Sequence, residues 1–162
     1  IGDKLMAMYG EFTHRVDDKG RVILPVSMRE VLGDKFVIAK SSDSTLKILY
    51  LYTREDWEKI IEAGARIAAK DRSKATYVRQ LSASGKDTEL DSQNRVLIPI
   101  ELRNYANIGK ETVLLGLGNR VEIWNKESYY INHPDETEVT KEKAQEDADK
   151  VASLLEEIAL LQ

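Results

Sequence analysis

Two short segments of the chain share a motif in which an aspartate is followed, four positions later, by an arginine. The motif runs from Asp17 to Arg21 and again from Asp91 to Arg95. An aspartate that begins a tight turn can accept hydrogen bonds from backbone amides. An arginine fork can bind a carboxylate, a phosphate or the edge of a guanine. The pattern therefore predicts two tight turns, each with a guanidinium group oriented by a carboxylate.

The fourth residue of each turn is Gly20 in the first motif and Asn94 in the second. Glycine and asparagine adopt positive φ angles more readily than other residues. We therefore expect the same backbone turn in both places. Two interpretations of the arginines stay open: each forms a salt bridge that only rigidifies a hairpin, or each binds a ligand while the aspartate orients it.

Polar residues surround both arginines. Lys19 stands near Arg21, and Gln93 and Asn94 precede Arg95. Arg, Lys, Gln and Asn are the residue types that contact base edges and phosphates. Their recurrence beside both motifs favours a nucleic-acid contact over a purely structural ion pair.

The two motifs belong to a longer internal repeat. The matching segments are VDDKGRVILPVSMREVL at 16–32 with LDSQNRVLIPIELRNYA at 90–106, KFVIAK at 35–40 with TVLLGL at 112–117, and LYLYTREDW at 49–57 with VEIWNKESY at 121–129. Because their order is the same in both copies, the chain contains a tandem duplication of a unit of about 50 residues.

Each copy is expected to form two strands, a short helix and two further strands. In the first copy a strand over 11–16 enters the turn, and the run 21–25 is predicted to be a buried strand because it is short, β-branched and ended by proline. Pro25 and Pro99 suit the first position of a helix, where no amide donor is needed. The remaining expected strands cover residues 36–39, 48–51, 113–117 and 121–124.

Helices are expected between and after the two copies. One is predicted over 54–70, with Thr53 as its N-cap and Asp56 completing a capping box, and another over 73–84. The expected organisation is a first repeat at 8–53, a helical linker at 54–85, a second repeat at 86–130 and an acidic helical extension at 131–162. The two repeats are expected to form one compact domain.

The extension reads as one helix from Thr137 to Gln162 with an apolar stripe. The stripe consists of Val151, Leu154, Leu155, Ile158 and Leu161. Three roles for it stay open: packing on its own chain, contact between subunits, and masking of a DNA-binding surface.

The net charge of −4 is not typical of a nucleic-acid-binding protein. However, residues 133–162 contain nine acidic and three basic residues, so this segment carries −6 and the first 132 residues carry +2. The chain has no cysteine and only two histidines, and no disulfide, metal or cofactor is expected. No apolar run approaches the roughly 20 residues of a membrane span, and no secretory pattern opens the sequence, so a cytoplasmic protein is expected.

Longer strings around both motifs resemble the MraZ family. They are MYGEFTHRVDDKGRVILPVSMREVLGDKFV at 8–37 and LDSQNRVLIPIELRNYANIGKETVLLGLGNRVEIWNKE at 90–127. The resemblance implies a mainly β fold with helices: a tandemly duplicated AbrB-like double-split, or swapped-hairpin, β-barrel with linking and C-terminal helices. It also implies a ring-shaped homo-oligomer that binds spaced direct repeats in double-stranded DNA, upstream of its own cell-division and cell-wall operon, at the nucleoid.

By position, the resemblance makes Asp17, Arg21, Asp91 and Arg95 the signature residues of the family. The expected DNA-binding set is Arg21, Lys19, Arg15, His14, Arg95 and Asn94. Arg21 is expected to be the principal base-reading residue, Lys19 and His14 to assist it, and Arg15 to contact phosphate. Arg95 is expected to be secondary, because its turn lacks the Lys-Gly pair of the first copy.

Other functions are weighed beside the transcriptional regulator. An antitoxin-like regulator of the same fold group and a non-enzymatic oligomeric scaffold are the alternatives. An enzyme is not expected, because the sequence shows no Ser-His-Asp set, paired-carboxylate pocket or phosphate loop, and no small-molecule substrate is expected either. The glycines in LGLGN at 115–119 lack a third at the required spacing, so a hairpin turn is predicted there.

Overall fold

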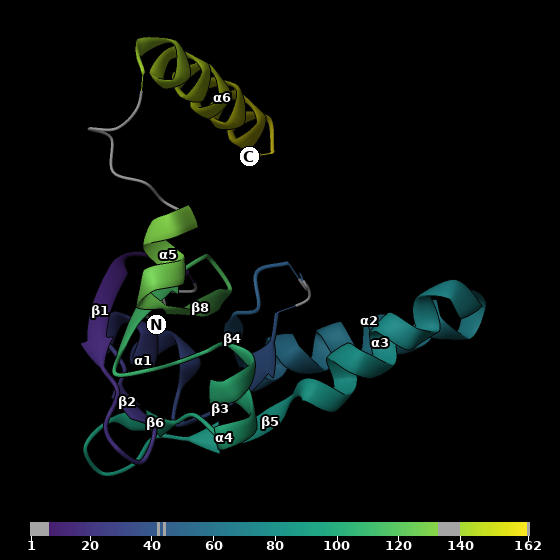
Figure 1. Cartoon of the computed structure of the whole chain (residues 1–162). Helices are drawn as coiled ribbons and strands as arrows, with labels where there is room; N and C mark the ends of the chain where they lie inside the picture. The colour runs from purple at the N-terminus through teal and green to yellow at the C-terminus, as the bar shows by residue number, and fades with distance from the viewer. Residues whose placement is uncertain (1–6, 42, 44, 133–139, 162) are drawn as a thin grey trace, which may run out of the picture. The chain divides into compact units, whose positions relative to one another are not determined.

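The strands of the two sequence copies are interleaved in space. A computed structural model describes residues 7–41, 43, 45–132 and 140–161. Contacts divide the chain into a first unit, residues 1–126, and a second unit, residues 127–162. Figure 1 shows the first unit as a sheet with short helices packed on it and a helical hairpin extending from it.

Each copy contributes four strands to the first unit. The first copy forms β1 Glu11–Arg15, β2 Arg21–Ile23, β3 Lys35–Lys40 and β4 Leu49–Thr53; the second forms β5 Lys86–Glu89, β6 Arg95–Leu97, β7 Glu111–Gly116 and β8 Arg120–Asn125. Six of them form one antiparallel sheet in the order β1-β7-β8-β4-β3-β5, and β2 and β6 form a separate two-stranded sheet.

The copies exchange their first strands. β1 pairs with β7 of the other copy, and β5 pairs with β3 in return. The remaining cross-copy pairs are β4 with β8 and β2 with β6. Val22 lies opposite Val96, its own counterpart in the repeat, and Tyr50 lies opposite Glu122 in the same way. The first unit therefore has a local two-fold arrangement that the duplication alone does not require.

The tandem duplication that the sequence predicts is confirmed, and the described residues form a mixed fold of antiparallel sheets and six helices. Within the described residues, hydrogen bonds build an open six-stranded sheet and a two-stranded sheet, and they do not close a barrel. The predicted hairpin at 115–119 is also present, because the amide of Leu117 donates to the carbonyl of Arg120 at 2.8 Å between β7 and β8.

The sheet register corrects one part of the repeat alignment. Arg15 pairs with Glu111, and the equivalent Glu89 pairs with Lys35. Lys35 is therefore the counterpart of Glu111 and not, as the sequence alignment has it, of Thr112. A shift of one residue exchanges the two faces of a strand. By this register the connection between helix and strand is two residues longer in the second copy, whereas the sequence alignment made it three residues longer, because apolar strands of similar composition can be matched in either of two adjacent registers.

The short helix of each copy follows a proline. α1 spans Val26–Leu32 and α4 spans Ile100–Tyr105. Pro25 and Pro99 lie at the N-cap, one position earlier than predicted, with φ near −56° in both. The carbonyl of each proline accepts the first amides of its helix, so the fixed φ of proline sets the direction in which the helix starts.

The helical hairpin between the copies agrees closely with the sequence. α2 covers Arg54–Lys70, as predicted, and α3 covers Arg72–Ser84. The Thr53 hydroxyl accepts from the amide of Asp56 at 3.0 Å and begins α2. A Cβ placed on Gly64 would lie 3.1 Å from Val78. Gly64 therefore weakens α2 locally but allows α2 and α3 to approach closely.

The second unit holds most of α5 Lys126–Asn132 and all of α6 Lys141–Leu160. Thr140 caps α6 by accepting from the amide of Lys143 at 3.2 Å. The predicted ends of this helix, Thr137 and Gln162, lie outside the described residues. No buried residue occurs in α6, and the role of its apolar stripe stays a prediction. Among the described helices, none is long and apolar enough to cross a membrane.

The segment 21–25 is not the fully buried strand that the sequence predicts. Val22 and Leu24 are buried, whereas Ile23 between them is 49% exposed. The second copy repeats this pattern, with Leu97 48% exposed between two buried residues. The prediction was wrong because an unbroken apolar run does not reveal which residues face the core when the strand is covered on one face only.

Replacing Leu24 by alanine is expected to lower the free energy of unfolding by about 2–5 kcal/mol, because it opens a cavity in a closed core. Ile23→Ala, one residue earlier, is the matched control and is expected to change it by about 0.5 kcal/mol or less. Urea denaturation at one protein concentration measures both. An equal decrease in the free energy of unfolding for both variants would contradict the assignment of Leu24 to the core and of Ile23 to the surface.

Candidate nucleic-acid interface

The first turn is held by a single carboxylate. One oxygen of Asp17 accepts from the amides of Lys19 and Arg21, at 3.0 and 2.9 Å. The other accepts from Nε of Arg21 at 2.6 Å. The backbone of Asp17 also bonds to Gly20 and Arg21. Gly20 has the positive φ predicted for it, 89°. The aspartate thus fixes both the backbone of the turn and the direction of the arginine.

The second turn repeats these bonds. One oxygen of Asp91 accepts from the amides of Gln93 and Arg95, each at 2.9 Å, and the other accepts from Nε of Arg95 at 2.8 Å. Asn94 has a φ of 61°. The expectation of one backbone turn in both copies is confirmed.

The two turns are joined to each other. The carbonyl of Gly20 accepts from the amide of Ile98 at 2.9 Å, and the carbonyl of Asn94 accepts from the amide of Leu24 at 3.1 Å. Nη1 of Arg95 lies 3.6 Å from a carboxylate oxygen of Asp17. Two turns whose equivalent residues are 74 positions apart therefore form one cluster at one end of the first unit, and the loops that carry them lie side by side (Figure 1).

Both arginine side chains are partly open to solvent. The side chain of Arg21 is 30% exposed and that of Arg95 23%. The bond to Asp17 uses Nε of Arg21, and binding to O6 and N7 of a guanine needs only the terminal amino groups. Arg95 also has a terminal nitrogen near the carboxylate of Asp17. This asymmetry supports the prediction that Arg21 is the principal base-reading residue.

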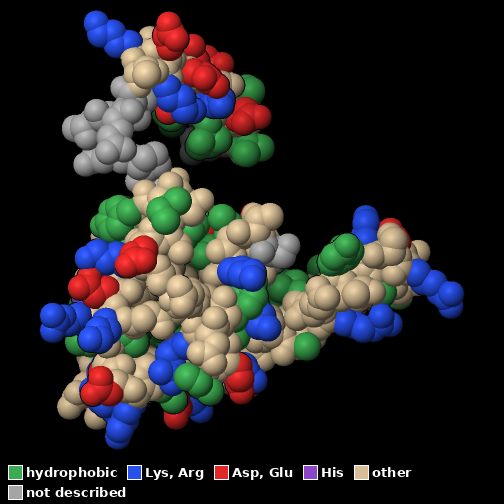
Figure 2. Space-filling model, viewed as in Figure 1, with side chains coloured by type: hydrophobic (Ala, Val, Ile, Leu, Met, Phe, Trp, Pro, Cys, Tyr) green, Lys and Arg blue, Asp and Glu red, His purple; other side chains and the backbone are tan. Residues whose placement is uncertain are grey.

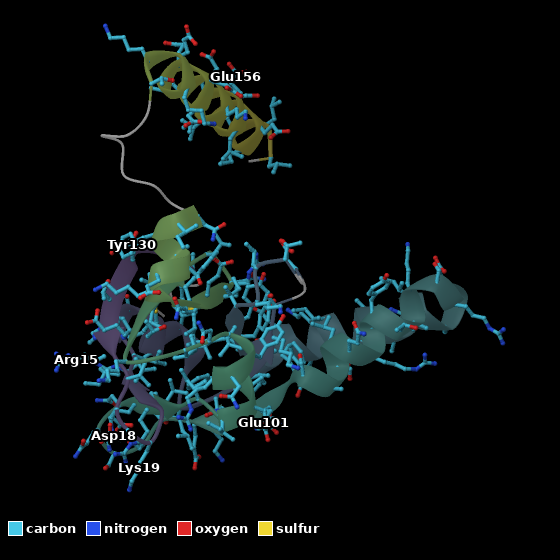
Figure 3. All side chains as sticks on the ribbon, viewed as in Figure 1. Arg15, Asp18, Lys19, Glu101, Tyr130 and Glu156 are labelled. Carbon is cyan, nitrogen blue, oxygen red and sulfur yellow. The ribbon has the colours of Figure 1, made fainter. Side chains whose placement is uncertain are left out.

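The other residues predicted to bind DNA differ in their exposure and in the face of the strand on which they lie. Lys19 is exposed at the tip of the first turn beside Asp18, and both point away from the body of the unit (Figure 3). Arg15 is exposed on β1, whereas His14 is half-buried on the opposite face of that strand. The structure thus places Lys19 in the same turn as Arg21 and separates His14 from Arg15.

Charges of both signs surround the turns. Figure 2 shows Lys and Arg side chains gathered on the side of the first unit that bears β1 and the turns, with Asp and Glu side chains among them. Arg15 lies opposite Glu111, whose carboxylate also pairs with Lys126. The Lys126 ammonium lowers the pKa of Glu111, with a smaller contribution from Arg15.

Arg103, to which the sequence analysis assigned no role, supports the first turn. Its Nε donates to the carbonyl of Ile98 at 2.9 Å. A Cβ added to Gly20 would lie 2.5 Å from the same atom. Arg29 is its repeat counterpart, but Nε of Arg29 is buried without a hydrogen-bond partner among the described residues. The repeat alignment contained this signal, because both arginines recur at the same position.

The carboxylates of the turns stay ionised to low pH. Chiefly because of the hydrogen bond from the Arg21 amide, the pKa of Asp17 is lowered from 3.8 to about 2, against an opposing effect of desolvation. The pKa of Asp91 is lowered too, chiefly by the amide of Arg95. At neutral pH both turns therefore combine a carboxylate with a guanidinium group.

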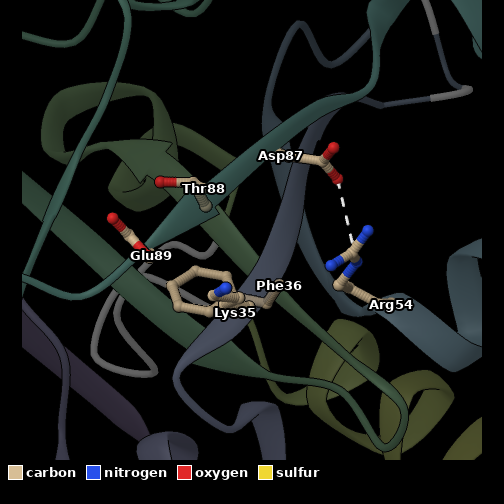
Figure 4. A pocket seen from close by; sticks show the side chains of 6 residues that line it. All are labelled: Lys35, Phe36, Arg54, Asp87, Thr88 and Glu89. Carbon is tan, nitrogen blue, oxygen red and sulfur yellow. Dashed lines mark ion pairs between the residues drawn. The ribbon is translucent and has the colours of Figure 1, made fainter.

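A pocket of about 320 Å³ lies apart from the turns, where β5 meets β3 and the start of α2 (Figure 4). It is lined by Lys35, Phe36, Arg54, Asp87, Thr88 and Glu89. Nε of Arg54 lies 4.0 Å from Asp87. Its lining thus contains two cations and two carboxylates. Within the described part of the chain, no group of His, Cys, Asp or Glu side chains could hold a metal ion.

Comparison with known proteins connects these turns to a family. The family model of the antitoxin-like MraZ protein matches residues 7–79 and 83–150, and each matched segment contains one Asp-to-Arg turn. The chain belongs to the MraZ family. The resemblance inferred from the two motifs is thereby confirmed, and the match covers both repeats.

Three relatives, each named transcriptional regulator MraZ, illustrate this membership. The protein of Acetivibrio thermocellus is 38% identical over 128 residues, which cover 79% of this chain and 87% of the relative. That of Caldanaerobacter subterraneus subsp. tengcongensis is 35% identical over 142 residues, or 88% and 96%. That of Caldicellulosiruptor saccharolyticus is 33% identical over 153 residues, or 94% and 99%.

Asp17→Asn is expected to lower the urea midpoint at pH 7, because asparagine keeps an acceptor oxygen but not the charge. Since folding lowers the pKa of Asp17 from 3.8 to about 2, the ionised carboxylate stabilises the fold above about pH 4 and this contribution is lost as the pH falls toward 2. The difference from wild type should therefore narrow over that interval. Asp18→Asn is the control, and a difference for Asp17→Asn that does not change with pH would contradict this role of the carboxylate.

Proposed function

We propose that the protein is a transcriptional regulator that binds specific sequences in double-stranded DNA through the paired Asp-to-Arg turns. The observation that supports this most is the joining of the two turns into one cluster with Arg21, Arg95 and Lys19 at its surface. Arginine forks read guanine, and lysine binds phosphate as a point charge. The names of the relatives in the family agree with this function.

The carboxylates in the cluster do not oppose this role. Asp17 and Asp91 are each engaged by backbone amides and by their own arginine. Their charge is therefore already compensated before DNA approaches. An arginine held in one direction also loses less conformational freedom on binding. Each turn therefore offers few groups to DNA, but its arginine is already oriented before DNA binds.

A single chain offers few base contacts, and we propose that a ring-shaped homo-oligomer multiplies them by binding spaced direct repeats in DNA. We place these repeats upstream of the protein's own cell-division and cell-wall operon. Binding then takes place at the nucleoid, in the cytoplasm. Each bidentate arginine contact contributes about 1–3 kcal/mol of discrimination. Several chains on one DNA molecule convert such contacts into avidity. The ring is supported by the resemblance to the MraZ family and by this avidity argument, and the operon is supported by the resemblance alone.

Arg21→Ala is expected to weaken binding to DNA from upstream of the protein's own gene by about 5-fold to 150-fold per engaged site, which corresponds to about 1–3 kcal/mol. Titration of labelled DNA at about 0.15 M salt measures the change. Arg66→Ala, an exposed arginine on α2, is the matched control and should bind as wild type does. Unchanged affinity for Arg21→Ala would remove Arg21 from the interface.

For the free protein, mass-resolved chromatography is expected to give the mass of several chains, as a ring requires. With DNA that carries several spaced sites, a single complex containing one assembly per duplex is expected, because linked sites bind together. A monomer that stays a monomer on DNA would refute the ring. A stable ring that binds no duplex would favour the alternative of an oligomeric scaffold.

A further inference from the structure

The outer face of the β2·β6 sheet carries exposed aliphatic side chains beside the two arginines. Alternation along each strand places Arg21 and Ile23 on this face, with Val22 directed into the core. Arg95 and Leu97 occupy the equivalent positions on β6. The face thus consists of two guanidinium groups and two aliphatic groups related by the local two-fold arrangement.

The pairing of β2 with β6 places each arginine opposite an aliphatic residue of the other strand. Arg21 lies directly opposite Leu97, and Ile23 lies directly opposite Arg95. Val26 and Ile100, at the starts of α1 and α4, are also exposed. Ile23 and Leu97 are diagonal neighbours across the two strands, and exposed aliphatic residues placed together, rather than scattered, mark a contact surface. Their position beside Arg21 and Lys19 indicates an anionic partner that also offers apolar groups.

The major groove of DNA offers such a combination. It admits a two-stranded β-ribbon, and its floor presents guanine O6 and N7 to arginine and the C5-methyl group of thymine to apolar side chains. Its phosphate borders match the ammonium group of Lys19, which is exposed at the tip of the first turn. A subunit contact would use the aliphatic groups but would leave the guanidinium groups with no assigned anion beyond Asp17 and Asp91.

We infer that Ile23 and Leu97 determine specificity by contacting thymine methyl groups next to the guanines bound by Arg21 and Arg95. This inference rests on the proposed DNA-binding function and extends it from the turns to the face of the ribbon. Each contact discriminates between thymine and the other bases through the apolar area that the methyl group buries. The pattern of alternating residues on the protein then corresponds to neighbouring guanine and thymine in the DNA.

Deoxyuridine provides the test, because it pairs as thymidine does but lacks the methyl group. A duplex selected by the wild-type protein from a random-sequence pool is synthesised once with thymine and once with uracil. Wild type is expected to bind the uracil duplex about fourfold more weakly for each methyl contact. Ile23→Ala and Leu97→Ala should each reduce this ratio, and the double variant should bind both duplexes equally.

Leu117→Ala is the matched control, since Leu117 is similarly exposed but lies between β7 and β8. It should retain the wild-type ratio. Equal binding of the two duplexes by wild type, or an unchanged ratio in the double variant, would overturn the inference while leaving the DNA-binding function intact. A double variant with a smaller assembly mass and the wild-type ratio would assign the face to a subunit contact instead. If the pool yields no enriched duplex, the proposed function fails and the inference fails with it.

Discussion

Backbone pairing between the two copies is the constraint on which the rest of the structure depends. Neither copy pairs its own first strand with its own third strand, because β1 adds to β7 and β5 adds to β3. A unit of about 50 residues buries too little apolar surface to be stable alone. Exchange of strands gives the two repeat copies one shared core, and the same exchange brings Asp17 and Arg95 together from distant parts of the chain.

The same constraint explains how arginines and carboxylates share one site in a chain with a net charge of −4. Each turn carboxylate is surrounded by amides and by its own guanidinium group, which lowers the pKa of Asp17 and of Asp91. The carboxylates therefore orient the arginines instead of competing freely with phosphate. Hydrogen bonds from Ile98 and Leu24 hold the two turns at a fixed spacing. The spacing of the arginines is thus a property of the paired ribbon and not of either loop.

Duplication within one chain also allows the two halves to differ. Gly20 leaves room for Arg103 to bond to Ile98, whereas the second turn has Asn94 and the equivalent Arg29 has a buried Nε without a partner among the described residues. Arg95 approaches the carboxylate of the other turn, and its side chain is less exposed than that of Arg21. An identical pair of chains could not divide the roles in this way. The division supports a primary role for Arg21 in the proposed function.

Local features of the chain were determined by the sequence. The turn bonds at Asp17 and Asp91, the positive φ angles of Gly20 and Asn94, the cap at Thr53 and the extent of α2 all depend on residues within four positions of one another. Short-range interactions of this kind can be predicted from a motif and its repeat. The family resemblance followed from the same motifs.

Tertiary structure decided what depends on distant pairing. The exchange of first strands, the alignment of Lys35 with Glu111 and the outward direction of Ile23 and Leu97 have no local signature. An apolar run has the same composition whether one face of its strand or both are covered, and a β register is fixed only when the partner strand is in place. The sequence therefore specified the arginine turns, and the pairing of β2 with β6 decided which side chains stand beside them.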